Sequence, residues 1–297
     1  MVFVFDCSIQ TEVPQAECEA LEVLYNTANG PAWANSTGWL MNLTPCSWFG
    51  VECSEGTVTE VVLYENGLSG PIPSELGDLS SLTELNLTSN ALTGGIPSEF
   101  GGLSQLTDLY LGNNELSGAI PEELADLTNL ERLYLNSNQL SGSLSPGFGS
   151  LAELKSLSVR DNLLSGAIPS ELGNFSNLET LLLGRNQFIG GIPAELGNLS
   201  NLMDFSLEHT QVGGAIPPEL GNLGNLKWVH LNDCGLSGAI PPELGNLTNL
   251  INLSLYSNDL TGPIPPELGG LSNLVILDLQ SNELTGTIPH QLGNLSN

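Results

Sequence analysis

Residues 106–129 read LTDLYLGNNELSGAIPEELADLTN, and the pattern LxxLxLxxNxLxGxIPxELGNLxN recurs ten times with a period of 24 residues. The first apolar position of each repeat keeps this register without insertion or deletion, at Val58, Leu82, Leu106, Leu130, Leu154, Leu178, Leu202, Leu226, Leu250 and Leu274. A strict period of this length predicts a solenoid, in which each repeat buries its apolar side against its neighbours. Function must then be sought in the positions that do not repeat.

Each repeat changes its hydrophobic period partway through. The LxLxx portion alternates every two residues, as a half-buried strand does, and the segment after Ile-Pro predicts a short helical or 3-10 turn. A repeated asparagine between them is expected to point inward and satisfy backbone groups of the loop. It stands at Asn66, Asn90, Asn114, Asn138, Asn162, Asn186, Asn258 and Asn282. Thr210 and Cys234 replace it in the seventh and eighth repeats, so we expect looser coils there and a buried, inert thiol.

The segment before the first repeat has a different character. We therefore divide the chain into an N-terminal cap, residues 1–57, and ten repeats, residues 58–297. A helix is predicted from about Glu17 to Tyr25, because Leu21 and Leu24 then share one face with that tyrosine. The tryptophans of this segment, which are expected to cover the first coil, are Trp33, Trp39 and Trp48.

Four of the five cysteines lie in the cap, at Cys7, Cys18, Cys46 and Cys53. We predict the disulfides Cys7–Cys18 and Cys46–Cys53, which would staple the open end of the solenoid and indicate an oxidising compartment. A zinc site is the alternative, although the spacing fits poorly and no histidine lies nearby in the sequence.

The chain is strongly acidic, with 33 Asp and Glu against 5 Lys and Arg and a formal charge of −28. Nucleic acid and anionic membrane surfaces are disfavoured partners because both require clustered cations. Such a charge favours a soluble monomer. No apolar run approaches the ~18 residues of a membrane span, and the opening MVFVF is too short for a signal-peptide core. Asn297 ends the tenth repeat, so we expect a missing C-terminal cap and a piece of a longer protein.

A family resemblance follows from these motifs. LSGAIPEEL and its counterparts resemble the plant-type leucine-rich repeat, and CSWFGVEC resembles the N-terminal cap of plant receptor kinases, receptor-like proteins and polygalacturonase inhibitors. The likeness covers roughly residues 46–297, whereas LYNTANGPAW resembles versions seen in protists, algae and some bacteria. It implies an α/β repeat solenoid, a leucine-rich-repeat superhelix with a concave parallel β-sheet, convex 3-10 or helical turns and a disulfide-stapled cap. An extracellular or cell-surface location is also implied.

Two repeated features are candidate sites. Eight repeats carry a glutamate two residues after the proline of Ile-Pro. These are Glu75, Glu99, Glu123, Glu171, Glu195, Glu219, Glu243 and Glu267. Stacked glutamates can hold calcium, but a carboxylate in the first turn of a helical segment is stabilised by the N–H groups there. We therefore expect an acidic stripe, with no metal and no cofactor. Sequons predict a glycoprotein if a eukaryote secretes the chain, at Asn35, Asn42, Asn86, Asn174, Asn198, Asn246, Asn252 and Asn294.

The solvent-facing strand positions form rows of side chains about 5 Å apart on the concave sheet, where a solenoid binds its ligand. All three arginines of the chain fall on this face. Local ion pairs are the alternative, namely Asp108–Arg132, Asp161–Arg185 and His209–Asp233. Arg160 is expected to have no carboxylate in its row, and Gly184 beside it leaves space. The candidate ligand-binding residues are Tyr110, Arg132, Tyr134, Arg160, Arg185, Glu208, His209, Trp228, His230 and Tyr256.

The leading functional hypothesis is an extracellular recognition module that binds a peptide, protein or glycan with aromatic anchors and arginines. The plant peptide receptors that the fold resembles use concave arginines on a peptide's terminal carboxylate. A secreted binder of wall polysaccharide or inhibitor of a glycosidase is the alternative. Ice binding is a more remote one, because the concave rows are irregular. An enzyme is not expected, since the histidines and acids lie on an open sheet without a lid or cleft.

Overall fold

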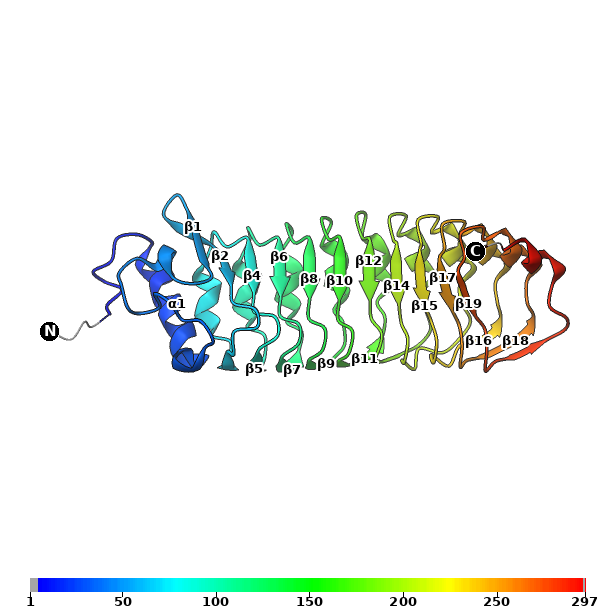
Figure 1. Cartoon of the computed structure of the whole chain (residues 1–297), viewed down its shortest axis with the longest axis horizontal. Helices are drawn as coiled ribbons and strands as arrows, with labels where there is room; N and C mark the ends of the chain where they lie inside the picture. The colour runs from blue at the N-terminus through cyan, green and yellow to red at the C-terminus, as the bar shows by residue number, and fades with distance from the viewer. Residues whose placement is uncertain (1–4, 296) are drawn as a thin grey trace. The chain divides into compact units, whose positions relative to one another are not determined.

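The computed structural model describes residues 5–295 and 297, so the first four residues of the predicted cap lie outside the described residues. The chain divides into two compact units, Met1–Ser141 (unit 1) and Gly142–Asn297 (unit 2). Both units are built from the predicted repeats, each with a main strand, in most repeats a second short strand, and a 3-10 turn (Figure 1). The expected solenoid of parallel strands and 3-10 turns is confirmed.

Unit 1 begins with the cap, whose helix α1 spans Gln15–Thr27, two residues longer at each end than predicted. The helix buries Leu21 and Leu24. Rings pack beside it, with the centroids of Trp33 and Trp39 4.9 Å apart. The centroids of Trp39 and Trp48 are 5.0 Å apart. The other cap elements are η1 Gly30–Ala32, η2 Pro45–Ser47 and β1 Val51–Ser54.

Both predicted disulfides are formed, Cys7–Cys18 and Cys46–Cys53, so these cysteines are not zinc ligands. A buried carboxylate also fastens the cap to the first repeat. Glu17 is 3% exposed, and its Oε2 accepts a hydrogen bond from the backbone N–H of Val58 at 2.7 Å. Burial raises the pKa of Glu17, although that hydrogen bond opposes the shift.

The main sheet of unit 1 starts with β1, which pairs antiparallel to β2, and continues with parallel strands in sequence order. These are β2 Thr57–Val62, β4 Glu84–Asn86, β6 Asp108–Tyr110 and β8 Arg132–Tyr134. The second strands are β3 Ser69–Pro71, β5 Ala91–Gly94, β7 Glu115–Ala119 and β9 Gln139–Gly142. The 3-10 turns are η3 Ser74–Asp78, η4 Ser98–Gly102 and η5 Glu122–Asp126.

Unit 2 repeats the same plan with six parallel main strands. They are β10 Ser156–Ser158, β12 Thr180–Leu182, β14 Asp204–Ser206, β15 Trp228–His230, β17 Asn252–Ser254 and β19 Ile276–Asp278. The second strands are β11 Leu163–Ala167, β13 Gln187–Ile189, β16 Ser237–Ala239, β18 Asp259–Pro263 and β20 Glu283–Thr285. The turns are η6 Pro146–Ser150, η7 Ser170–Asn174, η8 Ala194–Asn198, η9 Pro218–Asn222, η10 Pro242–Asn246, η11 Pro266–Gly270 and η12 His290–Asn294.

The repeated asparagine points inward, as predicted. Asn186 is 6% exposed, and its Nδ2 donates to the carbonyl oxygens of Val159 and Leu183 at 2.9 and 3.0 Å. Its Oδ1 accepts from the backbone N–H of Leu164 at 3.0 Å. One amide therefore links the asparagine's own loop to the preceding coil, which is why the position recurs.

Thr210 and Cys234 satisfy fewer backbone groups at the same position. Thr210 Oγ1 donates to the carbonyl of Leu207 at 2.8 Å, and Cys234 Sγ donates to the same carbonyl at 3.1 Å. Beside them, the row of second strands in unit 2 is interrupted. A single bridge, Gly214 with Leu236, lies between the strands β13 and β16 among the described residues. The greater looseness of these coils remains a prediction.

Candidate functional site

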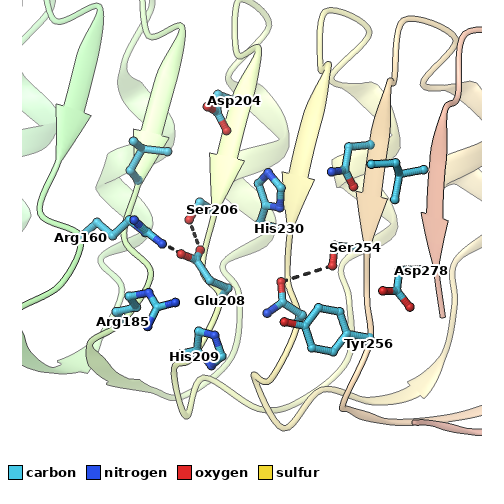
Figure 2. A pocket seen from close by; sticks show the side chains of 14 residues that line it. Arg160, Arg185, Asp204, Ser206, Glu208, His209, His230, Ser254, Tyr256 and Asp278 are labelled. Carbon is cyan, nitrogen blue, oxygen red and sulfur yellow. Dashed lines mark hydrogen bonds and ion pairs between the residues drawn. The ribbon is translucent and has the colours of Figure 1, made fainter. Parts of the chain in front are cut away.

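The 24-residue register places the same strand position of successive repeats side by side in unit 2. Asp204 lies opposite Trp228, which lies opposite Asn252. In the next row Ser206 lies opposite His230, which lies opposite Ser254. Polar side chains 24 residues apart therefore converge on the solvent-facing side of the main sheet (Figure 2).

These rows enclose a hollow of about 460 Å³, which we call the unit 2 hollow. Much of its floor is buried and polar, with Ser206, Glu208, Asn232 and Ser254 between 4% and 7% exposed. Ser254 Oγ donates to Asn232 Oδ1 at 3.3 Å. Its lining residues are Arg160, Leu182, Arg185, Asp204, Ser206, Glu208, His209, His230, Asn232, Asn252, Ser254, Tyr256, Ile276 and Asp278.

An ion pair between residues that lie two repeats apart crosses one side of this hollow. Arg160 Nε donates to Glu208 Oε1 at 2.6 Å, and Ser206 Oγ donates to the other carboxylate oxygen. The expectation that Arg160 has no carboxylate in its row is therefore wrong. Gly184 lies between the two, and a Cβ there would be 2.3 Å from Glu208 Oε2. The space left by this glycine is what lets the carboxylate reach the arginine.

Arg185 lies beside that pair, and its guanidinium forms no ion pair or hydrogen bond with any of the residues that the structure describes. The Asp161–Arg185 pair of the ion-pair alternative is thus absent, because Arg185 extends into the unit 2 hollow instead (Figure 2). The His209–Asp233 pair of the same alternative is present, with Nδ1 and Oδ2 2.6 Å apart. Arg185 is consequently the cation of this hollow that is left for a ligand.

Two side-chain oxygens near the other end of the hollow lack partners. Asp204 Oδ1 and Asn252 Oδ1 are buried without a hydrogen bond. Burial raises the pKa of Asp204, and Glu208 adds to the shift while His230 opposes it. Unsatisfied buried acceptors are uncommon in folded proteins and cost free energy. The unit 2 hollow therefore combines a free cation with acceptors that a donor group would stabilise.

The predicted residues of unit 1 form a separate cluster. Arg132 Nη1 pairs with Asp108 Oδ1 at 2.7 Å, as the ion-pair alternative expected. Tyr110 Oη also donates to that oxygen, at 2.9 Å, and the rings of Tyr110 and Tyr134 are stacked with centroids 5.3 Å apart. Burial raises the pKa of Asp108, but hydrogen bonds from Arg132, Tyr110 and Thr107 outweigh it and leave a net lowering. Arg132 is thus engaged within the protein.

Six of the ten predicted site residues line the unit 2 hollow, namely Arg160, Arg185, Glu208, His209, His230 and Tyr256. Trp228 is 39% exposed in the same sheet but is not among the lining residues. The lining residues outside the prediction include Asp204, Asn252 and Asp278. Asp204 already lies in the sequence row that contains Trp228, and extending the rows of Trp228 and His230 by one or two repeats would have added Asn252 and Asp278.

The glutamates after Ile-Pro lie in the first turns of 3-10 segments, as expected for a stabilising role. Within residues 5–295 and 297, no group of three or more His, Cys, Asp and Glu side chains is arranged to hold a metal ion. In the same part of the chain, no helix has the length and hydropathy needed to cross a membrane.

Family models match the repeats along most of the chain. A model described as leucine rich repeat matches residues 80–140. A second model with the same description matches residues 153–175, 177–199, 225–247, 249–271 and 273–295. The matches leave out residues 200–224, the repeat in which Thr210 replaces the asparagine.

Solved structures are similar over almost the whole chain. One is the ectodomain of the plant membrane receptor kinase GASSHO1/SCHENGEN3 from Arabidopsis thaliana in complex with CASPARIAN STRIP INTEGRITY FACTOR 2, with 36% identity over 93% of this chain and 34% of that chain and a TM-score of 0.87. Another is the Arabidopsis receptor kinase HAESA in complex with the peptide hormone IDA and the co-receptor SERK1. It shares 30% identity with this chain, the match covers 95% of this chain and 52% of that chain, and the TM-score is 0.75. A plant ice-binding protein shares 27% identity with this chain. The match covers 94% of this chain and 90% of that chain, with a TM-score of 0.81. This chain spans about a third to a half of the two receptor chains.

Proposed function

Because this chain belongs to the leucine-rich-repeat family, we propose that it is an extracellular recognition module whose unit 2 hollow binds a peptide. One of the similar structures is a receptor kinase in complex with a peptide hormone and a co-receptor. The two disulfides of the cap support an oxidising, extracellular compartment. The hollow supplies a buried polar floor and the ring of Tyr256, which suits a peptide with both polar and apolar groups.

The unpaired guanidinium of Arg185 is the observation that carries this proposal. Arg160 is held by Glu208, so Arg185 is the group that grips an acidic end of the peptide, through paired hydrogen bonds to a carboxylate. Asp204 and Asn252 also line the hollow, and rotation of their side chains would let their buried, unpartnered oxygens accept from amide or ammonium donors farther along the same peptide. A peptide with a free carboxylate therefore complements the hollow better than an uncharged one.

The test is an array of twelve-residue peptides, each synthesised with a free and with an amidated C-terminus. The intact protein and two variants, Arg185→Gln and Arg132→Gln, are applied to it. The second variant is a matched control, because it removes the same charge from an arginine that Asp108 already holds. Loss of a hydrogen bond to a charged group costs about 1.5–3 kcal/mol, so Arg185→Gln should weaken free-carboxylate peptides by about ten- to a hundredfold. Equal weakening by both variants would refute the proposal.

An acidic wall polysaccharide is the alternative ligand, and an oligogalacturonide array run beside the peptides separates the two. Binding there without peptide binding, and its loss in Arg185→Gln, would assign the hollow to a glycan. No specific contact in the structure favours this outcome over a peptide.

Ice binding is a second candidate function, supported by one observation. A plant ice-binding protein is similar to this chain over 94% of its residues, with 27% identity and a TM-score of 0.81. If the protein binds ice, we expect the intact protein to inhibit ice recrystallisation at micromolar concentration. Its absence, together with absence of thermal hysteresis, removes the candidate.

A further inference from the structure

A second hollow lies in unit 1, where the cap meets the first repeat. Its volume is about 490 Å³, and its walls include Phe49, Val62 and Tyr64. Both rings are open to solvent, with Phe49 40% and Tyr64 57% exposed. Large apolar side chains that gather in an exposed hollow are typical of an interaction surface, whereas scattered ones need no explanation. We call this the unit 1 hollow.

The electrostatics of this hollow are opposite to those of a carboxylate-binding site. Glu52 and Glu65 line it directly. Glu52 also lies opposite Glu60 on the neighbouring strand. Glu60 in turn lies opposite Glu84. Like charges directly opposite each other destabilise a sheet, so this face is at lower free energy when a cation is bound beside it.

The protein supplies little neutralising charge here. Among the described residues, those that line the unit 1 hollow include no lysine or arginine. Arg132 pairs with Asp108, at the far end of the row that contains Glu60 and Glu84. Burial raises the pKa of Glu60, and the carboxylates of Glu52, Glu84 and Asp108 raise it further. The lysines and arginines of the protein therefore leave the negative charge of this face unbalanced.

We propose that the unit 1 hollow docks a basic peptide segment of a partner protein. An arginine or lysine side chain of the partner lies against the rings of Phe49 and Tyr64, and its charge faces Glu52 and Glu65. A cation over an aromatic ring and an apolar stem packed against it are both favourable, and together they explain why rings and carboxylates occur here side by side. This site is independent of the peptide site proposed for unit 2, since it lies in another unit and selects the opposite charge.

The probe is an acetylated and amidated heptapeptide of alternating arginine and leucine, titrated calorimetrically into the intact protein at low salt. Two variants alter the hollow, Tyr64→Ala and Glu52→Gln. Their matched controls are Ile189→Ala and Glu219→Gln, which remove an exposed apolar side chain and an exposed glutamate in unit 2. The controls matter because the formal charge of −28 attracts any polycation.

We expect each hollow variant to weaken the peptide by about tenfold and each control by less than about twofold. Folding is checked by thermal unfolding, in which Glu52→Gln should be at least as stable as the wild type because it removes a like-charge contact with Glu60. The proposal is overturned if the wild type does not bind the peptide, or if variants and controls weaken it equally. In the latter case the overall charge, and not the hollow, holds the peptide.

Discussion

Replacement of Gly184 by alanine should separate the two charged side chains that cross the unit 2 hollow. A Cβ at this position would lie 2.3 Å from Oε2 and 2.5 Å from Cδ of Glu208, well inside van der Waals contact. The backbone of Gly184 is not in the left-handed region, so alanine fits the main chain without strain. The clash is with the far end of the Glu208 side chain, so the carboxylate must move, and we expect this movement to break its contacts with Arg160 and Ser206.

The size of the effect follows from those contacts. A hydrogen bond to a charged group contributes about 1.5–3 kcal/mol. The Arg160 side chain is 42% exposed, however, so solvent screens the pair and we take about 1–2 kcal/mol for its loss. Alanine in place of glycine stabilises by about 0.4–1 kcal/mol, because the unfolded chain has fewer conformations. The net loss of unfolding free energy is therefore about 0–1.5 kcal/mol.

A control separates the two contributions. Gly224 is exposed, and a Cβ there would meet nothing within 4 Å, so Gly224→Ala keeps the gain and avoids the clash. The measurement is urea unfolding followed by circular dichroism, in which Gly184→Ala should be about 1–2 kcal/mol less stable than Gly224→Ala. In a Glu208→Ala background that difference should vanish, because no carboxylate remains to be displaced. A difference of the same size in both backgrounds would refute this account of Gly184.

Three further outcomes are expected. Thr210→Asn should raise the free energy of unfolding, measured in urea, by about 0.5–2 kcal/mol. Its amide can reach the carbonyls of Leu183 and Leu207, which are equivalent to the carbonyls of Val159 and Leu183 that Asn186 binds one repeat earlier. An unchanged urea midpoint would contradict this. Burial raises the pKa of Asp204, so its ionised form costs stability once the pH exceeds the unfolded value of about 3.9. Asp204→Asn should thus stabilise the protein at about pH 7 and not at about pH 3, and pH-independent stabilisation would exclude this cause. Burial also raises the pKa of the Cys234 thiol to about 11, so iodoacetamide at about pH 8 should label the native protein slowly. After unfolding without reductant, the same reagent should label one thiol per chain.

The sequence by itself was sufficient for the features that repeat or act locally. Leu178 and Leu181 could be assigned to the core because every repeat buries the same positions, and both are 0% exposed. The inward asparagine at Asn186 followed from the same regularity. The two cap disulfides could be paired because each joins cysteines close in sequence, 11 and 7 residues apart. Register also located most of the unit 2 hollow, since a 24-residue spacing places equivalent side chains on adjacent strands.

The partners of the charged side chains were decided by the tertiary structure. Arg160 and Glu208 are 48 residues apart, and their contact exists because the intervening Gly184 has no side chain. An ion pair of Arg185 with Asp161 was the alternative in the sequence analysis, yet Arg185 extends into the hollow and remains free of the described residues. A repeat pattern fixes where each Cα lies, but long side chains choose among several neighbours within reach. That choice depends on rotamers and on the size of the residue between them, which a period of 24 does not encode.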